Sequence, residues 1–281
     1  MNQLTSSVVA SWHGADPRLC QVMESLTRHL HAFLDEVEPT QEEWQRGIDY
    51  LTATGHMCDA TRHEFILLSD VLGVSMLVEE INHGKPAGAT ESTVLGPFHM
   101  VDSPVRALGD EISLDGVGQP CLVAGRVLDL DANPVPGALV DVWQANGEGF
   151  YDVQQPDLQP ERNLRGLFTA DDDGRYWFRS VVPRYYPIPD DGPVGALLGA
   201  TGRHPNRPAH VHFIAGAEGF SPVTTQVFVE GSPYLDSDAV FGVKPSLVRA
   251  VRTETDADLA ASYDMTAPFA LLEFDLVLDR E

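Results

Sequence analysis

The heptapeptide Arg207-Pro-Ala-His-Val-His-Phe213 alternates polar and apolar side chains over its second half, and a period of two predicts a β-strand. Along a strand, side chains two residues apart project from the same face, so His210 and His212 lie side by side. Val211 and Phe213 then point the other way, into a core. Two imidazoles on one face can bind one metal ion together, which makes this strand a candidate metal site.

A second pair with the same spacing, His29 and His31, lies in a helical pattern instead. The apolar residues around it recur at three- and four-residue steps, as on one face of an amphipathic helix: Leu19, Val22, Met23, Leu26, Leu30, Phe33 and Leu34. On a helix, residues two apart lie about 200° apart around the axis. These two rings therefore cannot share an ion.

The helical period continues to about residue 85. Thr40 with Glu43 and Thr61 with Glu64 have the spacing of capping boxes, in which side chains satisfy the free N–H groups of a first helical turn. We expect a helix to begin at each place, and we expect Gly73 to end the second one. The first part of the chain is therefore predicted to be helical.

Beyond residue 100 the pattern changes to short strands broken by glycine and proline. The expected strands are 121–130, 138–145, 175–182, 209–216, 223–230 and 270–278. No helix-length pattern separates most of them, which favours an antiparallel sandwich or barrel. The stretch 182–207 is long, irregular and rich in proline, and because it runs into the histidine strand we expect it to be a functional loop.

Bulk composition excludes some classes of function. The 281 residues carry a net charge of −24, which repels polyphosphate at long range and argues against nucleic-acid binding. Cys20, Cys58 and Cys121 are odd in number and widely spaced, which suits a reducing compartment better than a disulfide framework. No basic leader and no long apolar run is visible, so we expect a cytoplasmic protein that does not bind a membrane.

Two histidines rarely complete a metal site, and carboxylates are one source of further ligands. Glu218 follows His212 by six residues, which resembles the cupin pattern of a His-x-His pair followed by a glutamate. The spacing is one residue longer than usual, and no histidine follows His212. A cupin-like site would therefore lack its last ligand.

Tyrosines are the other possible donors. Tyr151 follows an expected strand, and Tyr185 and Tyr186 lie in the irregular stretch. A phenol has a pKa of about 10, so a tyrosinate at neutral pH needs a strong positive charge nearby. A ferric ion supplies such a charge and prefers hard anionic oxygen. Two tyrosinates and two neutral imidazoles would leave an Fe(III) site with a net charge of about +1, able to accept hydroxide or a dianionic substrate.

Four segments carry a resemblance to a known family. They are Glu91-Ser-Thr-Val-Leu-Gly-Pro-Phe98, the strand and loop that end at Tyr151, Tyr186-Pro-Ile-Pro-Asp-Asp-Gly-Pro193, and His204-Pro-Asn-Arg-Pro-Ala-His-Val-His-Phe213. Taken in this order, they resemble the intradiol ring-cleavage dioxygenases of the catechol and hydroxyquinol 1,2-dioxygenase group. The resemblance extends over roughly residues 15–278.

The resemblance implies an α+β fold and a non-haem Fe(III) site. A helical N-terminal dimerisation domain, residues 1–100, would precede a mixed-topology β-sandwich catalytic domain, residues 101–281. The implied metal ligands are Tyr151, Tyr186, His210 and His212, with Tyr186 and His212 in axial positions. The family also implies a homodimer through the N-terminal helices, and a lipid-like molecule can lie at that interface.

The implied reaction cleaves an aromatic diol with O2 between its two hydroxylated carbons. Tyr186 would leave the metal and accept a substrate proton, while Arg207 would stabilise negative charge that develops on the ring. Gln226 matches another position beside the reaction centre. The implied substrate-binding residues are Leu67, Asp70, Val94, Gly96, Pro97, Phe98, Ile188, Pro189 and Arg207.

Hydroxyquinol, 1,2,4-trihydroxybenzene, is the expected substrate, and 3-hydroxy-cis,cis-muconate (the tautomer of maleylacetate) is the expected product. A carboxylate at Asp70 can accept a hydrogen bond from the third hydroxyl group, and a buried acceptor discriminates against a substrate that lacks the donor. Cleavage of catechol or a chlorocatechol to the corresponding muconate is the alternative. A cupin-like protein, or a non-catalytic β-sandwich that binds a metal or a sugar, is a more distant one.

Overall fold

The computed structural model describes residues 2–59 and 62–281, and the chain forms two compact units, Met1–His56 and Met57–Glu281. The helices between residues 64 and 82 belong to the second unit. The boundary predicted between residues 100 and 101 stays a prediction. Within the described ranges, no helix is both long enough and apolar enough to cross a membrane.

The first unit consists of three helices: α1 (Gln3–Ser11), α2 (Pro17–Val37) and α3 (Gln41–His56). The predicted capping box at the start of α3 is confirmed, because the Glu43 carboxylate accepts from the Thr40 backbone N–H at 2.8 Å and the Thr40 hydroxyl accepts from the Glu43 N–H at 3.2 Å. The amphipathic stripe predicted along α2 is exposed on this chain at Leu19, Val22, Leu26, Leu30, Phe33 and Leu34.

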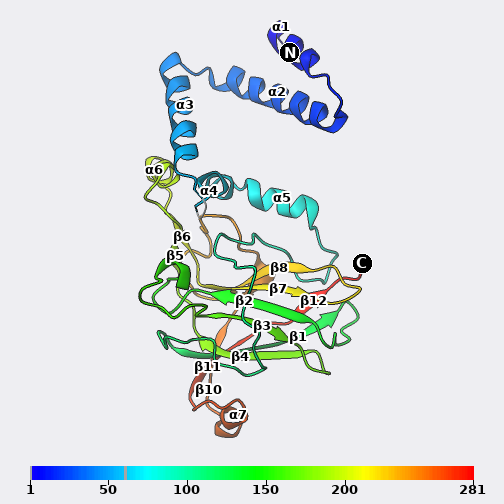
Figure 1. Cartoon of the computed structure of the whole chain (residues 1–281), viewed down its shortest axis with the longest axis vertical. Helices are drawn as coiled ribbons and strands as arrows, with labels where there is room; N and C mark the ends of the chain where they lie inside the picture. Colours follow the sequence, from blue (N-terminus) through cyan, green and yellow to red (C-terminus); the bar gives the residue numbers. More distant parts are fainter. Residues whose placement is uncertain (1, 60–61) are drawn as a thin grey trace. The chain divides into compact units, whose positions relative to one another are not determined.

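The second unit begins with two further helices, α4 (Glu64–Val71) and α5 (Val74–Asn82). Gly73 separates them with a left-handed φ of 71°, a conformation that glycine adopts without steric cost, so the predicted helix end is confirmed. The capping box predicted for Thr61 lies outside the described residues. In Figure 1, α4 and α5 lie on the side of the sandwich that carries β7 and β8.

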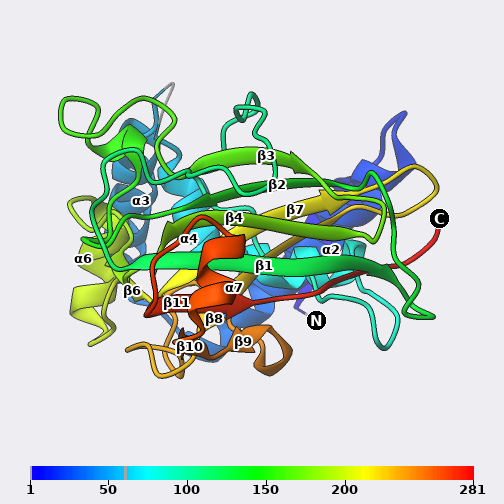
Figure 2. The same cartoon turned by 90° about the horizontal axis from the view of Figure 1, so that it is seen from below.

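Two five-stranded sheets form a β-sandwich in the second unit. One sheet has the order β10-β11-β1-β12, with β4 paired to β1, and its strands are β1 (Pro120–Asp129), β4 (Arg175–Val181), β10 (Val251–Glu254), β11 (Phe269–Glu273) and β12 (Leu276–Leu278). The other has the order β3-β2-β7-β8-β9, with β2 (Leu139–Gln144), β3 (Arg165–Thr169), β7 (His210–Gly216), β8 (Val223–Val229) and β9 (Val248–Arg249). Figure 2 shows the same layers from below, with α7 (Ala257–Ser262) beside the first sheet.

The α+β class and the mixed-topology sandwich that the resemblance implied are confirmed, but several details differ from what the local patterns alone predicted. The topology is mixed and not purely antiparallel, because β1 pairs in parallel with β11 and β12, and β8 pairs in parallel with β9. The last expected strand is two strands, β11 and β12. The stretch 182–207 contains a helix, α6 (Pro193–Ala200), and a small ladder between β5 (Tyr186–Pro187) and β6 (Asn206–Arg207).

The main core fills the space between the two sheets. Val211 and Phe213 are completely buried in it, as the period of two predicted. The opposite face of β7 therefore presents His210 and His212. Cross-strand pairing places His212 between Trp143 of β2 and Gln226 of β8, so three adjacent strands contribute one polar row beside the core.

Candidate active site

Four potential metal-binding side chains converge in the second unit. Tyr151 precedes the short 3-10 helix η1 (Asp152–Gln154), Tyr186 begins β5, and both histidines lie on β7. The Oη atoms of Tyr151 and Tyr186 are 3.4 Å apart, and Tyr186 Oη is 3.4 Å from His210 Nε2. The Nε2 atoms of His210 and His212 are 3.1 Å apart. Ligands with metal bonds of about 2.0–2.1 Å lie about 3 Å from one another around one ion, so these atoms can share one.

The tandem tyrosines occupy different surroundings. Tyr186 pairs with Arg207 in the β5–β6 ladder, and its side chain is buried beside the other donors. Tyr185 is half-buried, and its ring packs edge-on against that of Tyr234 at a centroid distance of 5.2 Å. Only Tyr186 of the pair therefore belongs to the donor cluster.

The two histidines are held as neutral imidazoles. His210 Nδ1 lies 2.7 Å from the carbonyl oxygen of Pro208, which accepts a hydrogen bond from a protonated Nδ1 and leaves the Nε2 lone pair facing the cluster. Burial, with the charge of Arg207, lowers the pKa of His210 to about 3. Burial and the neighbouring His210 also hold the pKa of His212 well below its ordinary value. The Trp143 indole stacks on the His212 ring at 4.6 Å.

The two phenols need a cation in order to ionise. Burial raises the pKa of both tyrosines above the ordinary value, that of Tyr151 well above it, and the neighbouring Tyr186 raises the pKa of Tyr151 further. A trivalent ion at the shared point between the oxygens would reverse this preference, because opposite charge at close range favours the anionic form. Two buried phenol oxygens and two imidazole lone pairs therefore fit a ferric ion by geometry and by ligand chemistry.

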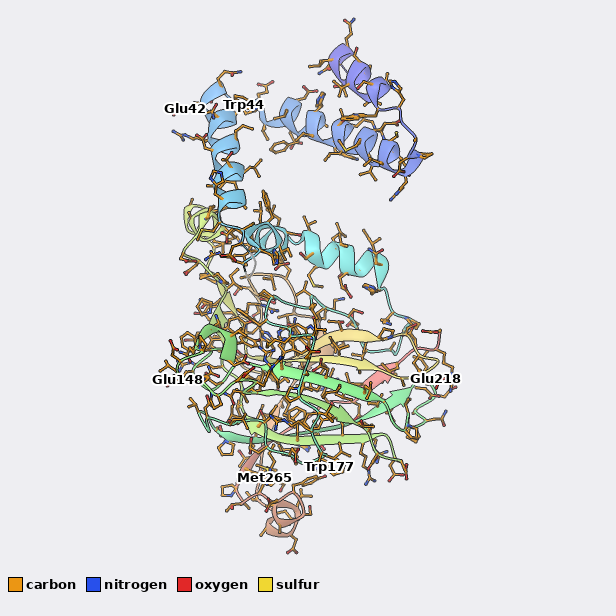
Figure 3. The ribbon with its side chains drawn as sticks, viewed as in Figure 1. Glu42, Trp44, Glu148, Trp177, Glu218 and Met265 are labelled. Carbon is orange, nitrogen blue, oxygen red and sulfur yellow. The ribbon has the colours of Figure 1, made fainter. Side chains whose placement is uncertain are left out.

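A cupin-like ligand set is not formed. Glu218 is exposed, and Figure 3 shows it at the periphery of the sandwich. Over the described part of the chain, no group of three or more His, Cys, Asp and Glu side chains is arranged to hold a metal ion. The carboxylate alternative is therefore wrong, and the tyrosines are the available partners for the histidines.

Arg207 lies beside the donor cluster in a buried polar network. Its Nη1 is 3.3 Å from His210 Nε2, and its Nη2 donates to the Gln226 side-chain oxygen at 2.7 Å. Asp238 accepts from Arg207 Nε at 3.0 Å and from Nη2 at 3.1 Å. Gln226 in turn donates to the Val94 carbonyl oxygen at 2.8 Å. The structure thus joins two predicted catalytic residues and adds Asp238, which the sequence analysis missed.

A second buried ion pair supports Tyr151 from the other side. Arg165 Nε lies 3.0 Å from both carboxylate oxygens of Asp152, the residue next to Tyr151, and Arg165 Nη2 lies 2.6 Å from one of them. Arg165 Nη1 also donates to the Phe98 carbonyl oxygen at 2.7 Å. The Phe98 ring stacks on that of Tyr151 at 4.5 Å. Arg165 therefore ties the Tyr151 loop to the segment that contains the predicted pocket residue Phe98.

An apolar cluster contains several predicted substrate-binding residues. Leu67, Val94 and Ile188 are buried in it with Val240, which the sequence analysis did not select. The further members are Val71, Met76, Val194, Leu198 and Ala239. Four predicted positions are less enclosed: Pro97 is exposed, and Gly96, Phe98 and Pro189 are half-buried. We call this cluster the apolar wall, because sites for aromatic ligands are lined mainly by apolar side chains of this kind.

Asp70 and Gly96 complete the predicted set. Asp70 is buried on α4, and burial raises its pKa, against a hydrogen bond from Ser75 and the positive charge of Arg207. The negative charge of Asp238 also raises the pKa of Asp70, so the charges of the Arg207–Asp238 pair act on this carboxyl. Gly96 has a φ of 77°, and a Cβ added there would lie 3.1 Å from His212 Cε1, so the backbone at this residue packs directly against a histidine of the cluster.

Comparisons with known proteins agree with this geometry. The family model described as "Dioxygenase" matches residues 102–280, and the one described as "Catechol dioxygenase N terminus" matches residues 16–90. This chain belongs to the intradiol ring-cleavage dioxygenase family. A hydroxyquinol 1,2-dioxygenase of Rhizobium sp. (strain MTP-10005) is 56% identical to this dioxygenase over 94% of this chain and 90% of the relative.

Two further relatives extend the comparison. A 6-chlorohydroxyquinol 1,2-dioxygenase of Cupriavidus pinatubonensis is 51% identical to this dioxygenase, over 94% of this chain and 95% of the relative. The solved structure of a hydroxyquinol 1,2-dioxygenase from Pseudomonas putida DLL-E4 is 48% identical and superposes with a TM-score of 0.95, over 99% of this chain and 98% of the other. The family resemblance found in the sequence is thereby confirmed for this intradiol dioxygenase.

Proposed function

We propose that this dioxygenase uses Fe(III) held by Tyr151, Tyr186, His210 and His212 to cleave hydroxyquinol with O2. The bond between the two adjacent hydroxylated carbons breaks and each of these carbons gains one oxygen atom, so that one hydroxyquinol and one O2 give one 3-hydroxymuconic acid and no other product. The observation that carries the proposal is the convergence of two buried phenols and two neutral imidazoles, with neighbouring donor atoms 3.1–3.4 Å apart. The names of the hydroxyquinol-cleaving relatives support the choice of substrate.

The bound Fe(III) would supply a Lewis-acidic centre that chelates the diol and activates it towards O2. The protein residues have separate tasks around it. The histidines stay neutral, since burial opposes their protonation, and they anchor the ion from the sheet. Burial raises the pKa of the Tyr186 phenol, so its ionised oxygen would be a strong base that can accept a proton from a substrate hydroxyl group. Arg207 Nη1 faces this region and stabilises negative charge on the substrate oxygens.

Asp70 is proposed to select hydroxyquinol over catechol. Its buried carboxyl lies in the helix that also contributes Leu67 to the apolar wall. Removal of its acceptor should cost about 1.5–3 kcal/mol for substrates with a third hydroxyl group, which is a loss of about 10- to 160-fold in kcat/KM. Asp70→Ala should therefore lower the hydroxyquinol-to-catechol ratio of kcat/KM, while Asp70→Asn, which keeps an acceptor oxygen, should lower it less. An unchanged ratio in Asp70→Ala would refute this role.

The ligand set has a spectroscopic test. An Fe(III)–tyrosinate protein absorbs in the visible range, so the purified iron-loaded protein should be red to purple. Tyr186→Phe should shift or weaken this band and lower the iron content, and Tyr185→Phe, its matched neighbour outside the cluster, should change neither. A colourless protein that contains one iron per chain would exclude the tyrosinate ligands. Oxygen uptake with hydroxyquinol, catechol and chlorocatechols side by side would then measure the substrate preference.

We further propose a homodimer through the helices of the first unit. The apolar stripe on α2, which includes Leu26, Leu30 and Phe33, is exposed on a single chain. An exposed apolar surface of this kind marks a site of contact with another molecule. In the dimer this face would be buried against a second copy, with a lipid-like molecule between the copies. Analytical ultracentrifugation should give twice the mass of the chain. Leu30→Glu places a charge in the apolar stripe and should lower the measured mass towards that of a monomer. Mass spectrometry of an organic extract tests for the lipid. A monomeric wild-type protein at micromolar concentration would overturn the dimer.

A further inference from the structure

The guanidinium of Arg207 has five N–H donors, and the network around it uses three of them on one side. Nε donates to Asp238, and the two Nη2 hydrogens are directed to Asp238 and to the Gln226 oxygen, with distances of 2.7–3.1 Å. Nη1 is left with His210 Nε2 at 3.3 Å. An iron ion bound to His210 would occupy that nitrogen lone pair. Both Nη1 hydrogens would then be available to a substrate.

Asp238 is itself held in place from behind. One carboxylate oxygen accepts from the Gly242 N–H at 2.9 Å, and the other lies 3.4 Å from the Val240 N–H. The side chains of Arg207 and Asp238 are only 3% and 2% exposed, so water does not compete for the pair. Burial by itself would raise the pKa of Asp238, but the charge and hydrogen bonds of Arg207 keep it below the ordinary value. The carboxylate therefore stays ionised next to the guanidinium.

The surroundings leave the guanidinium almost no alternative position. A Cβ added at Gly242 would lie 2.9 Å from Arg207 Nη2 and 3.2 Å from an Asp238 oxygen. The Gln226 amide, which accepts from Nη2, is fixed at its other end by the Val94 carbonyl oxygen. A two-point contact with a carboxylate fixes the plane of a guanidinium as well as its distance. Arg207 is therefore oriented by Asp238, Gln226 and the backbone at Gly242, none of which is among the four proposed metal ligands.

We propose that Asp238 is a positioning residue for ring cleavage, whose carboxylate turns the Arg207 guanidinium so that the Nη1 edge alone faces the iron ligands and the substrate. This inference rests on the proposed function. Loss of the carboxylate lets the guanidinium rotate or move, and a misplacement of about 1 Å can lower a rate by about 100-fold. The effect should fall on kcat, because Arg207 acts on charge that develops during the reaction.

The test uses iron-loaded enzyme, with kcat expressed per bound iron. Asp238→Asn places an N–H group against the Arg207 donors, and we expect kcat for hydroxyquinol to fall about 10- to 100-fold while KM changes less than about threefold. The position of the visible absorption band should not change, because the four ligands are intact. Asp236→Asn is the matched control, since Asp236 is exposed two residues away, and its kcat should equal that of the wild type.

A double-variant cycle separates positioning from general damage. In an Arg207→Ala background, Asp238→Asn should lower kcat by less than about twofold, because the residue on which it acts is gone. Equal losses in both backgrounds, or a kcat of Asp238→Asn within twofold of the wild type, would overturn the proposal.

If Asp238→Asn does not fold, Gly242→Ala tests whether the position of the Arg207 guanidinium controls kcat. The added methyl would lie 2.9 Å from Arg207 Nη2 and 3.2 Å from an Asp238 oxygen, so the guanidinium must shift while both charged side chains remain, and a lower kcat with an unchanged absorption band is expected. A wild-type kcat in Gly242→Ala would overturn the proposal. Failure of the proposed function would look different, because the iron-loaded wild type would then show no oxygen uptake with any diol.

Discussion

The buried ion pair between Arg165 and Asp152 should be one of the most sensitive points in the second unit. The side chains of Arg165 and Asp152 are 1% and 5% exposed. Among the described residues, Asp152 is the only carboxylate that pairs with the Arg165 guanidinium. Asp152→Ala would leave Arg165 charged, buried and unpaired. Removal of one partner of such a pair costs about 3–5 kcal/mol.

This free-energy loss converts to a measurable shift in melting temperature. For a folded unit of about 150–250 residues, 1 kcal/mol corresponds to about 2–4 °C, so Asp152→Ala should lower the Tm of the second unit by about 6–20 °C. Differential scanning calorimetry of the metal-free protein measures this directly. Because Asp152 adjoins Tyr151, the variant should also bind iron more weakly, which metal analysis after dialysis would show.

Two further variants sharpen the test. Asp173→Ala removes the carboxylate of an exposed ion pair with Arg175, at 3.8 Å, and should cost less than about 1 kcal/mol. Asp152→Ala combined with Arg165→Met leaves no unpaired charge, and it should recover much of the stability lost in the single variant. If Asp152→Ala lowers the Tm no more than Asp173→Ala does, the reasoning about the buried pair is wrong.

Three other outcomes are expected. Gly96→Ala adds a methyl group 3.1 Å from His212 Cε1 at a residue with a left-handed φ, and it should lower both the Tm and the iron content. Gly202→Ala is the control, because Gly202 has a similar φ and an added Cβ would have no atom within 4 Å. It should show only the cost of the left-handed backbone, about 1–2 kcal/mol. Burial raises the pKa of Cys121 to about 12, so iodoacetamide at pH 8 should label this thiol only after the protein is denatured. Peptide mass spectrometry measures the labelling, and a labelled Cys121 in the native protein would contradict this prediction. Burial raises the pKa of Asp70 in the folded protein above its unfolded value, so the wild type loses stability as the pH rises through the folded-state pKa. Asp70→Asn cannot ionise, so in denaturant titrations its stability relative to the wild type should increase as the pH is raised from about 4, the unfolded-state pKa. A difference in stability that does not change with pH would count against this reasoning.

Much of the fold follows from local periodicity, and the exceptions have physical causes. The capping box at Thr40 and the alternation along β7 are local signals, and both are confirmed. The parallel pairing of β1 with β11 joins segments about 150 residues apart, and no local pattern reports such a partner. Helix α6 was missed because Pro193 and its glycines resemble a loop, although proline is favoured in a first helical turn.

The four predicted metal ligands could be recognised in the sequence, whereas the aspartates that hold the neighbouring arginines could not. The His-x-His spacing and the tyrosines stand out in the sequence because their residue types have specific chemistry. Asp238 and Asp152 do not stand out, because an aspartate in an acidic chain is usually a solvated surface group. Only the fold brings them to Arg207 and Arg165. One signal in the sequence could have pointed to these aspartates. An arginine that is expected to be buried beside the metal ligands needs a buried carboxylate as its partner.

The apolar wall and the four proposed metal ligands come from different parts of the fold. β7 lies in the middle of its sheet, paired on both edges, so displacing a histidine would disturb the sandwich. Leu67 and Asp70 belong to α4, which is outside both sheets. On the proposed assignment of Leu67 and Asp70 to the substrate site, substitutions on this helix would alter the choice of ring substituent without breaking a hydrogen bond of either sheet. Such a division makes the scaffold evolvable: new substrates can be acquired, or engineered, while the oxygen chemistry is inherited unchanged.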